Sequence, residues 1–320
     1  VPQKRTLRHS LWLGWEVLCV IKVLGLGDNV CDVYLHTKIM YPGGQALNFA
    51  VYSAQLGVQA DFLGVFGQDD IARHVQQTLD KKGIGRSHCR SYPGENGFAQ
   101  VIVENGERTF VGSNRGGVLH EHPIKLQHED VSYASSFQLI HTSNNGFTDD
   151  ILPTLYGLPL FVSYDFSSRW NETKRVDQVS PYVDFAFLSC SELNNEETKA
   201  LCSYLCQKGC GVVTATRGDK GAIAYDGMRF YQQLPYLVKT VDTMGAGDSF
   251  AAAMLITILK AMEPDGFKKW SDSSFRAAVL PDALNRAAEF SAQICLIHGA
   301  FGSGTSVPAS VQARVFRELW

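Results

Sequence analysis

The sequence predicts an α/β protein built on a mostly parallel β-sheet. From Cys19 onward, short apolar segments rich in β-forming residues alternate with longer segments of helical periodicity. This alternation is typical of strands that share one sheet and are covered by helices. A length of 320 residues and a hydrophobic content of 45% allow a large core, and a charged content of only 19% argues against a disordered or coiled-coil chain.

The apolar segments and the amphipathic segments give a set of expected elements. Strands are predicted at residues 20–26, 62–66, 160–165, 185–188, 211–216 and 222–225. Helices are predicted at residues 46–56, 71–82, 196–208, 248–262 and 282–296. The polar segment 263–274, which contains Pro264 and Gly266, is predicted to be a surface loop between the last two helices.

Two segments interrupt the alternation of strands and helices. Residues 98–104 and 107–111 flank Asn105-Gly106, a dipeptide that suits a type I′ turn, and therefore predict an antiparallel hairpin. Residues 32–41 are also extended and follow the first strand without an intervening helix. Together, residues 32–41 and 97–112 predict a small β-layer beside the main sheet, a kind of layer that often closes over a ligand as a lid.

Composition excludes several classes of function. Lys and Arg number 29 against 32 Asp and Glu, so the chain has no basic excess with which to bind nucleic acid. Eight cysteines without a C-x-x-C pair predict neither a disulfide scaffold nor a zinc site. Cys202, Cys206 and Cys210 are expected to be buried or half-buried thiols, and reduced thiols favour a cytoplasmic location.

The start of the chain resembles a weak signal peptide, because basic residues precede an apolar stretch. Glu16 interrupts that stretch and no small-residue cleavage site follows, so residues 1–18 are expected to be a non-native or disordered leader. No other segment approaches the roughly 18 uninterrupted apolar residues of a membrane span, so no membrane partner is expected.

The segment 241–250, Val-Asp-Thr-Met-Gly-Ala-Gly-Asp-Ser-Phe, carries the strongest chemical signal. Small residues at 245–247 lead directly into an apolar helix, so backbone N–H groups are left without intrahelical partners and can bind a phosphate or an oxyanion. Asp248 lies within reach of that anion site and could accept a proton from a hydroxyl during phosphoryl transfer. The alternative is an aspartate that only caps its own helix.

Other phosphate-binding motifs are absent from the sequence. No G-x-x-x-x-G-K-[ST] string occurs, which excludes a P-loop enzyme. Gly25 and Gly27 begin a dinucleotide fingerprint, but Val30 stands at the position of the third glycine and Asp28 would repel a pyrophosphate. A Rossmann dehydrogenase is therefore not expected.

The Gly-Ala-Gly-Asp segment, together with Gly43-Gly44, resembles the ribokinase-like (PfkB) family of carbohydrate kinases from about residue 19 to about residue 304. Three strings, residues 27–34, 165–170 and 242–250, are most similar to the members of that family that phosphorylate fructosamines. The resemblance implies a three-layer α/β/α domain over residues 19–304 with a β-sheet lid, followed by a C-terminal tail at 305–320. It also implies an ATP-dependent enzyme that phosphorylates the 6-hydroxyl of a fructoselysine-type Amadori compound, or alternatively of fructose or another ketose. A sugar-binding relative without turnover remains a further alternative.

On the sugar side, the resemblance assigns Asp248 as the catalytic base and Gly245, Ala246 and Gly247 as the anion hole. Asp32 corresponds to the acceptor of sugar hydroxyls, although an aspartate there could simply form a turn. The other residues implied to bind substrate are Gly43 and Gly44, whose backbone can approach a sugar closely, and Asn48, which can both donate and accept hydrogen bonds unless it is simply exposed.

The lid and the segment after residue 165 are expected to select the substrate. Gln100 and Arg108 are polar residues of the lid and could equally lie on a solvated strand face. Arg169, beside Trp170, could bind the amino-acid carboxylate of a fructosamine or could anchor a loop. Lids of this family often form the dimer interface, so the resemblance also implies a homodimer.

On the nucleotide side, the resemblance places Thr216, Gly218 and Gly221 along the ATP phosphates. An ordinary hairpin turn is the alternative interpretation of those residues. Asn285 and His298 are implied to lie near the adenine, although His298 could instead be a core or capping histidine.

Two acidic residues are implied to interact with cations. Glu192 corresponds to a residue that places Mg²⁺ through water, but Ser189 stands where the family commonly has asparagine, and Mg²⁺ held by phosphates and water tolerates such a change. Asp242 resembles the aspartate near a monovalent cation site, which implies possible activation by K⁺.

Overall fold

The computed structural model describes residues 20–104, 106–263 and 266–317. Its main sheet has nine strands in the order β13-β12-β11-β10-β9-β8-β1-β4-β5, and all neighbouring pairs are parallel except β11–β12 and β12–β13. The strands are β1 Lys22–Gly27, β4 Gln59–Phe66, β5 Arg90–Ser91, β8 Leu139–Ser143, β9 Phe161–Ser167, β10 Phe185–Ser189, β11 Val212–Thr216, β12 Ala222–Tyr225 and β13 Phe230–Gln233. The six predicted strands are therefore confirmed within a few residues.

Helices cover both faces of this sheet and bury two separate apolar clusters. One cluster lies under α2 Gln45–Gln55, α3 Asp70–Lys81, α9 Ala246–Met262 and α10 Ser273–Ile294. The other lies under α4 Val118–Glu121, α5 His128–Ala134, α6 Leu152–Tyr156, α7 Thr173–Val179 and α8 Asn195–Lys208. Val23 belongs to the first cluster and Leu24 to the second, because successive residues of a strand point to opposite faces. These layers confirm the predicted three-layer α/β/α architecture.

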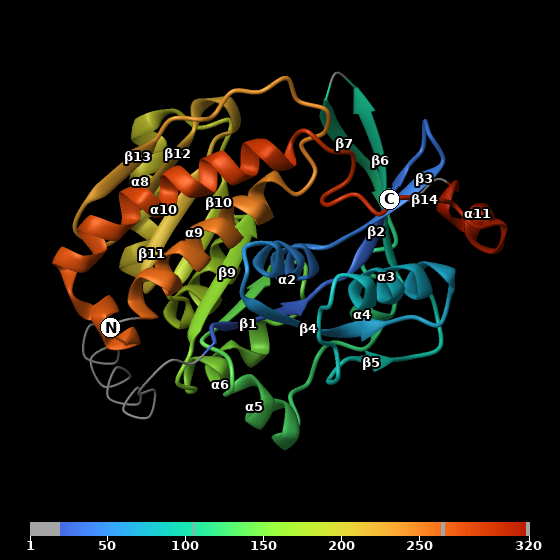
Figure 1. The fold of residues 1–320 in the computed structure, drawn as a ribbon, viewed down its shortest axis with the longest axis horizontal. Coiled ribbons are helices and arrows are strands. Elements are labelled where there is room, and N and C mark those ends of the chain that lie inside the picture. Colours follow the sequence, from blue (N-terminus) through green and yellow to red (C-terminus); the bar gives the residue numbers. More distant parts are fainter. Residues whose placement is uncertain (1–19, 105, 264–265, 318–320) are drawn as a thin grey trace.

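A smaller sheet stands to the right of the main sheet in Figure 1. Its strand order is β14-β3-β2-β6-β7, with β2 Val30–Tyr34, β3 Ile39–Gly43, β6 Gly97–Glu104, β7 Glu107–Ser113 and β14 Thr305–Ser306. β6 and β7 pair antiparallel, as the hairpin prediction requires. Gly106 has a φ of +83° in the turn, whereas Asn105 lies outside the described residues.

The C-terminal tail packs against this small sheet. β14 pairs with β3, and α11 Ala309–Val315 buries Val311 and Val315. The predicted leader, residues 1–18, lies outside the described residues.

The structure corrects the predicted surface loop at 263–274. A 3-10 helix at Phe267–Ser271 buries Phe267 and Trp270, and α10 begins at Ser273 rather than at residue 282. The helix continues through Pro281, which the sequence pattern suggests as a helix boundary. Packing of α10 along α9 outweighs the local preference of the proline.

The strand β8 was not predicted, because half of it is polar. His141, Thr142 and Ser143 are nevertheless fully buried. His141 Nδ1 lies 2.9 Å from Ser163 Oγ and its ring stacks on Phe49, and burial lowers its pKa to about 3. This histidine is therefore a neutral core residue.

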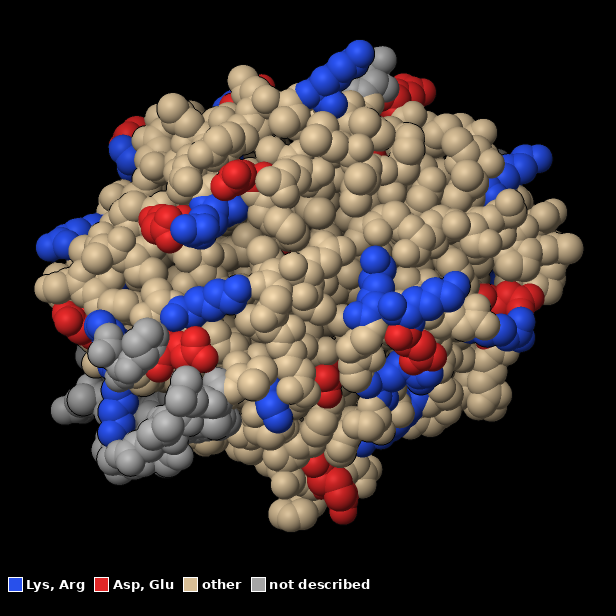
Figure 2. Space-filling view, viewed as in Figure 1, with Lys and Arg blue, Asp and Glu red and all other residues tan. Residues whose placement is uncertain are grey.

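The charge and thiol predictions can be compared with the structure directly. On the face shown in Figure 2, Lys and Arg are interspersed with Asp and Glu. Every cysteine of the described residues is free, with Cys202 and Cys210 buried and Cys206 half-buried. No helix within the described ranges is long and apolar enough to cross a bilayer.

Candidate active site

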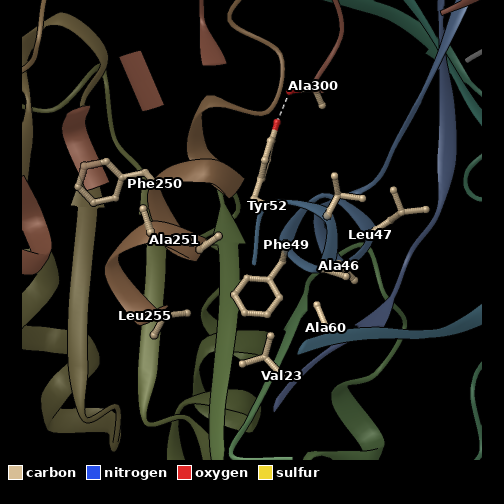
Figure 3. Packing of buried hydrophobic residues seen from close by; sticks show 14 of the residues in the cluster. Val23, Ala46, Leu47, Phe49, Tyr52, Ala60, Phe250, Ala251, Leu255 and Ala300 are labelled. Atoms are coloured by element: carbon tan, nitrogen blue, oxygen red, sulfur yellow. Dashed lines mark hydrogen bonds between the residues drawn. The ribbon is translucent and has the colours of Figure 1, made fainter. Parts of the chain in front are cut away.

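The site is organised around the N-terminus of α9. Gly245 precedes the helix with a φ of +76°, in the left-handed region that favours glycine. A Cβ at this position would lie 2.2 Å from the Tyr52 hydroxyl oxygen. Figure 3 shows Tyr52 reaching from α2 to Ala300, whose carbonyl oxygen accepts its hydroxyl proton. Gly245 is therefore required by both its conformation and its contacts.

Some backbone amides at the start of α9 have a protein acceptor and others have none. Ala246 N–H donates to the Thr243 carbonyl at 3.2 Å, so this amide is not free for an anion, in contrast to the prediction. The amides of Gly247 and Asp248 have no acceptor among the described residues. The Cα of Gly247 faces open space, since no atom lies within 4 Å of the position that a Cβ would occupy. The Gly247 and Asp248 amides are thus the ones that an anion could bind at this helix start.

Asp248 lies in the first turn of α9 and is 9% exposed. Asn48 of α2 donates from Nδ2 to Asp248 Oδ2 at 2.6 Å, while Asn48 Oδ1 is buried without a partner. Burial raises the pKa of the Asp248 carboxyl to about 8, and the negative charges of Asp165 and Asp28 act in the same direction. A carboxylate with a pKa near neutrality is suited to accept a proton.

Asp32 joins this group from the small sheet. Its side chain is 4% exposed and has no hydrogen-bond partner among the described residues. A Cβ on Gly43 would lie 2.6 Å from Asp32 Oδ2 and 3.9 Å from Asn48 Oδ1. Burial raises the pKa of Asp32 to about 7, although the positive charge of Arg108 opposes this shift. The structure therefore brings Asp32, Gly43, Asn48 and Asp248 together, as predicted.

Gly44 and Asp28 fix the start of α2 beneath the site. Gly44 has a φ of +112°, and a Cβ there would lie 2.7 Å from the Asp28 carbonyl oxygen. The Asp28 carboxylate accepts hydrogen bonds from the amides of Gln45 and Ala46 at 2.8 and 3.1 Å. Asp28 therefore caps α2 from a distant part of the chain, a role that no local sequence signal indicates.

Arg108 reaches the same group from β7. Its Nη1 donates to the Thr243 carbonyl, and its positive charge lowers the pKa values of Asp32 and Asp248. Arg108 Nε is buried without a partner. The structure thus places this predicted lid residue near the two aspartates rather than on a solvated strand face.

Two other predicted substrate residues lie elsewhere. Ala99 pairs with Asp32 in the small sheet, so its neighbour Gln100 points to the opposite face. Gln100 donates to the carbonyl oxygens of Val315 and Arg317 at the end of α11. Arg169 is 52% exposed and lies 3.9 Å from Glu172. The structure does not bring Gln100 or Arg169 into the cluster around Asp248.

Asp165 is a further residue of the site to which sequence reasoning gave no role. It lies at the carboxyl end of β9, opposite Ser143 of β8, and is 5% exposed. Its Oδ1 accepts the Ser167 amide proton at 2.6 Å. Burial raises the pKa of Asp165 to about 6, and its charge contributes to the high pKa of Asp248. The position of an aspartate at the end of a buried apolar strand is the signal that could have found it.

The predicted nucleotide loop follows β11 on the same edge of the main sheet. Thr216 ends the strand and donates to the Leu188 carbonyl at 3.2 Å. Gly218 and Gly221 have φ values of +58° and +80°, and a Cβ on Gly221 would lie 2.1 Å from the Gln233 carbonyl oxygen. The left-handed glycines make a tight turn with exposed backbone, which suits the phosphates of a nucleotide.

The remaining nucleotide and cation residues are more exposed or already paired. Asn285 accepts a hydrogen bond from Tyr236 at 2.9 Å, and His298 is exposed. Glu192 is exposed beside Ser191. The two carboxylate oxygens of Asp242 accept protons from the Met244 amide, the Gly299 amide and the Tyr34 hydroxyl. Asp242 therefore ties the small sheet to the start of α9 through protein donors on both of its oxygens.

Comparison with known families identifies this arrangement. A family model described as pfkB family carbohydrate kinase matches residues 19–303. The chain belongs to this family. As a pfkB family member, it is a sugar phosphotransferase, and the resemblance inferred from the Gly-Ala-Gly-Asp segment is confirmed.

Individual relatives of this pfkB kinase support the same conclusion. Fructosamine kinase FrlD of Bacillus subtilis is 37% identical over 89% of this chain and 94% of its own length. Fructoselysine 6-kinase of Escherichia coli is 30% identical over 86% of this chain and 98% of its own length. The structure of Arabidopsis thaliana ribokinase in complex with ribose and ATP aligns with a TM-score of 0.70 at 18% identity, covering 89% of this chain and 96% of ribokinase. That likeness confirms the ribokinase-like fold.

Proposed function

We propose that this sugar kinase transfers the γ-phosphoryl group of ATP to the 6-hydroxyl of a fructosamine, with Asp248 as the general base. The observation that carries the proposal is the contact between Asp248 and Asn48 beside Asp32 and Gly43. This cluster combines a buried carboxylate of raised pKa with unpartnered acceptors for sugar hydroxyls. The two relatives named as fructosamine and fructoselysine kinases support the choice of substrate.

The sugar would be held by side chains that already occupy their positions. Asp32 can accept two hydroxyl protons, and Asn48 Oδ1 can accept a third. Gly43 allows the Asp32 carboxylate to keep its position, because any Cβ there would clash with Asp32 Oδ2. Burial of these groups excludes water that would otherwise compete as an acceptor of the phosphoryl group.

Proton removal and charge stabilisation would then occur at the start of α9. Asp248 takes the proton of the 6-hydroxyl as the oxygen attacks the γ-phosphorus and the bond to the β-phosphate oxygen breaks. The free amides of Gly247 and Asp248 and the dipole of α9 stabilise the negative charge of the transferring group. Arg108 balances part of the charge of the two aspartates.

On the nucleotide side, the protein offers Mg²⁺ one exposed carboxylate rather than a complete set of ligands. No group of three metal-ligating side chains occurs among the described residues, and Mg²⁺ is usually held by one or two carboxylates together with phosphates and water. Glu192 is an exposed carboxylate that could hold such an ion through water, which would neutralise phosphate charge. Three protein donors bind the Asp242 carboxylate, and Oδ1, which accepts only one of them, keeps an acceptor position for a cation such as K⁺. Activation by K⁺ and dimerisation through the small sheet stay predictions of the family resemblance.

The test is ADP release with Mg-ATP across fructoselysine, other fructose–amino acids, fructose, ribose and 2-keto-3-deoxygluconate. The proposal predicts the highest kcat/KM for one fructosamine, because polar groups that bind the amino-acid arm would be left unpaired by free fructose. Comparable kcat/KM values for fructose and fructosamines would instead favour a fructokinase. Absence of turnover with every sugar would favour a sugar-binding protein.

A further inference from the structure

A cleft of about 460 Å³ lies at the base of the small sheet, outside the cluster around Asp248. Residues from the end of β7, from α4 and from the C-terminal tail line it. Its lining includes charged side chains of both signs. Arg115 and Arg317 are positive, and Glu95 and Glu121 are negative. His120 adds an aromatic ring to the lining. No residue placed in the sugar or nucleotide site lines this cleft.

The cleft neighbours the sugar site across closely packed glycine backbones. A Cβ on Gly44 would lie 3.0 Å from the Asn29 Cα, and a Cβ on Gly97 would lie 3.0 Å from the Asn29 carbonyl oxygen and 3.2 Å from the Gly116 Cα. Gly116 stands between Arg115 and Gly117, which both line the cleft. Asn29 and Gly97 therefore lie between Gly44 of the sugar site and Gly116 beside the cleft.

An exposed aromatic side chain stands beside this connection. Phe147, in the loop after β8, is 37% exposed, and its ring lies 5.2 Å from that of His120. A Cβ on Gly116 would lie 3.3 Å from the Phe147 ring. Phe147 and Arg115 have φ values of +52° and +55°, a left-handed conformation that is uncommon for residues other than glycine and is often found at ligand sites.

The direction of the sugar follows from the proposed function. If the 6-hydroxyl lies at Asp248, C1 is at the opposite end of the ketose and points away from α9. Contacts lead in that direction from Asn48 to Gly43 and Gly44, and then to the cleft. In a fructosamine, C1 carries the amine through which the amino-acid arm is attached. The arm would therefore leave the sugar site toward the cleft.

We propose that the cleft binds the α-amino and α-carboxylate groups of the amino-acid arm of the substrate. The Arg115 guanidinium group has the charge and donors to bind a carboxylate, and Glu121 can accept from an ammonium group, whereas Arg317 and Glu95 lie 3.9 Å apart as an ion pair. The methylene groups of a lysine arm would pass along Phe147 and His120. The proposal rests on the proposed function and adds the residues that would distinguish a fructosamine with a free amino-acid head from a plain alkylamine adduct.

The experiment compares two substrates that differ only in this head. One is fructoselysine linked through the lysine ε-nitrogen, and the other is 1-deoxy-1-pentylaminofructose, which keeps the amine and five carbons but lacks both α-groups. We expect wild-type kcat/KM to be at least about 10-fold higher for fructoselysine, since charge-assisted hydrogen bonds are lost with the analogue. Arg115→Gln and Glu121→Gln are each expected to reduce this ratio several-fold. Arg73→Gln, an exposed arginine on α3 that pairs with Asp70, is the matched control and should keep the ratio.

Calorimetric titration of the two sugars without ATP separates this proposal from the proposed function. Turnover of both sugars with equal kcat/KM and equal affinity would overturn the role of the cleft and leave the kinase assignment intact. Tighter binding of fructoselysine that depends on Arg115 and Glu121, without any phosphorylation, would support the cleft and overturn the reaction. If Arg115→Gln and Glu121→Gln lowered kcat/KM and affinity equally for both sugars, the proposal would also be overturned, because the substitutions would then have a general structural effect.

Discussion

The proposed sugar side and the proposed nucleotide side of the site differ in how deeply their residues are buried and how firmly the protein holds them. On the sugar side, Asp32, Asn48 and Asp248 are at most 9% exposed and are held against glycine backbones. On the nucleotide side, Glu192 and His298 are exposed, and Gly218 has open space around its Cα. The sugar side is therefore preorganised, whereas the nucleotide side is a set of open loops.

This difference follows from the chemistry of the two ligands. A sugar is neutral at its hydroxyls, so the charge that activates it must come from buried protein groups such as Asp248. A nucleotide carries its own charge, and helix ends and glycine turns bind its phosphates through backbone amides. We therefore expect substitutions on the sugar side to affect catalysis more than matched substitutions on the nucleotide side.

The largest effect is expected from Asp248→Asn. The amide cannot accept the hydroxyl proton, so kcat should fall by about 10²- to 10⁴-fold with little change in ATP affinity. The measurement is steady-state ADP release together with ATP titration. Asp177→Asn, at an exposed aspartate of α7 that pairs with Lys208, is the matched control and should keep kcat within a few-fold. A fully active Asp248→Asn would contradict the assignment of the base.

A smaller effect is expected from Gly43→Ala. The new methyl group would lie 2.6 Å from Asp32 Oδ2 and displace that carboxylate, so KM for the sugar should rise about 10-fold or more. Gly218→Ala meets no atom within 4 Å and is strained only by its φ of +58°, which costs about 1 kcal/mol. It should lower stability slightly and leave the KM for the sugar unchanged. If the two variants had equal KM values for the sugar, the expected difference between the sugar side and the nucleotide side would be contradicted.

The thermal stability of wild type relative to Asp248→Asn should fall with rising pH, in the opposite sense to wild-type activity. Because burial raises the folded-state pKa of Asp248 from 3.8 to about 8, the carboxyl group costs no stability below pH 3.8 but destabilises the native state increasingly as the pH rises from 3.8 to 8. The variant should therefore melt several degrees above wild type at pH 9, with about 2–4 °C for each kcal/mol, and this difference should shrink steadily as the pH falls toward 4. Calorimetric scans of the ligand-free proteins test this, and a lower melting temperature at pH 9 would contradict it.

The smallest effect is expected from Glu192→Gln. Since Mg²⁺ is held mainly by phosphates and water, loss of one exposed carboxylate should raise the Mg²⁺ concentration for half-maximal activity only several-fold. Titration of activity with MgCl₂ at fixed ATP measures this value. An unchanged titration curve would show that Glu192 does not help to place the ion.

Elements with a strong local pattern were predictable from the sequence. The amphipathic segment that becomes α3 and the apolar segment that becomes β10 needed no tertiary information. β8 was missed because its polar residues are buried with hydrogen-bond partners elsewhere in the sequence, as His141 is with Ser163 and Ser143 with Asp28. The predicted start of α10 at residue 282 was too late, because packing on α9 outweighs the tendency of Pro281 to end a helix.

Within the site, motif residues could be predicted, but strand faces and long-range contacts could not. Asp248 and Gly245 stand in one short segment, so a local pattern contains both. Gln100 was placed in the correct strand, but a shift of one residue decides which face a side chain occupies, and Ala99 is the residue beside Asp32. The capping of α2 by Asp28 joins residues far apart in the chain and only a three-dimensional structure reveals it.

The most direct test of the central claim is the pH dependence of kcat/KM for fructoselysine at saturating Mg-ATP, with fructose as a second substrate that has no ionisable group in this range. If buried Asp248 accepts the hydroxyl proton, kcat/KM should fall on the acid side for both sugars, with an apparent pKa far above 3.8 and near the value of about 8 for the ligand-free site. A rate that stays level down to pH 5 for both sugars would contradict the claim that Asp248 is the base.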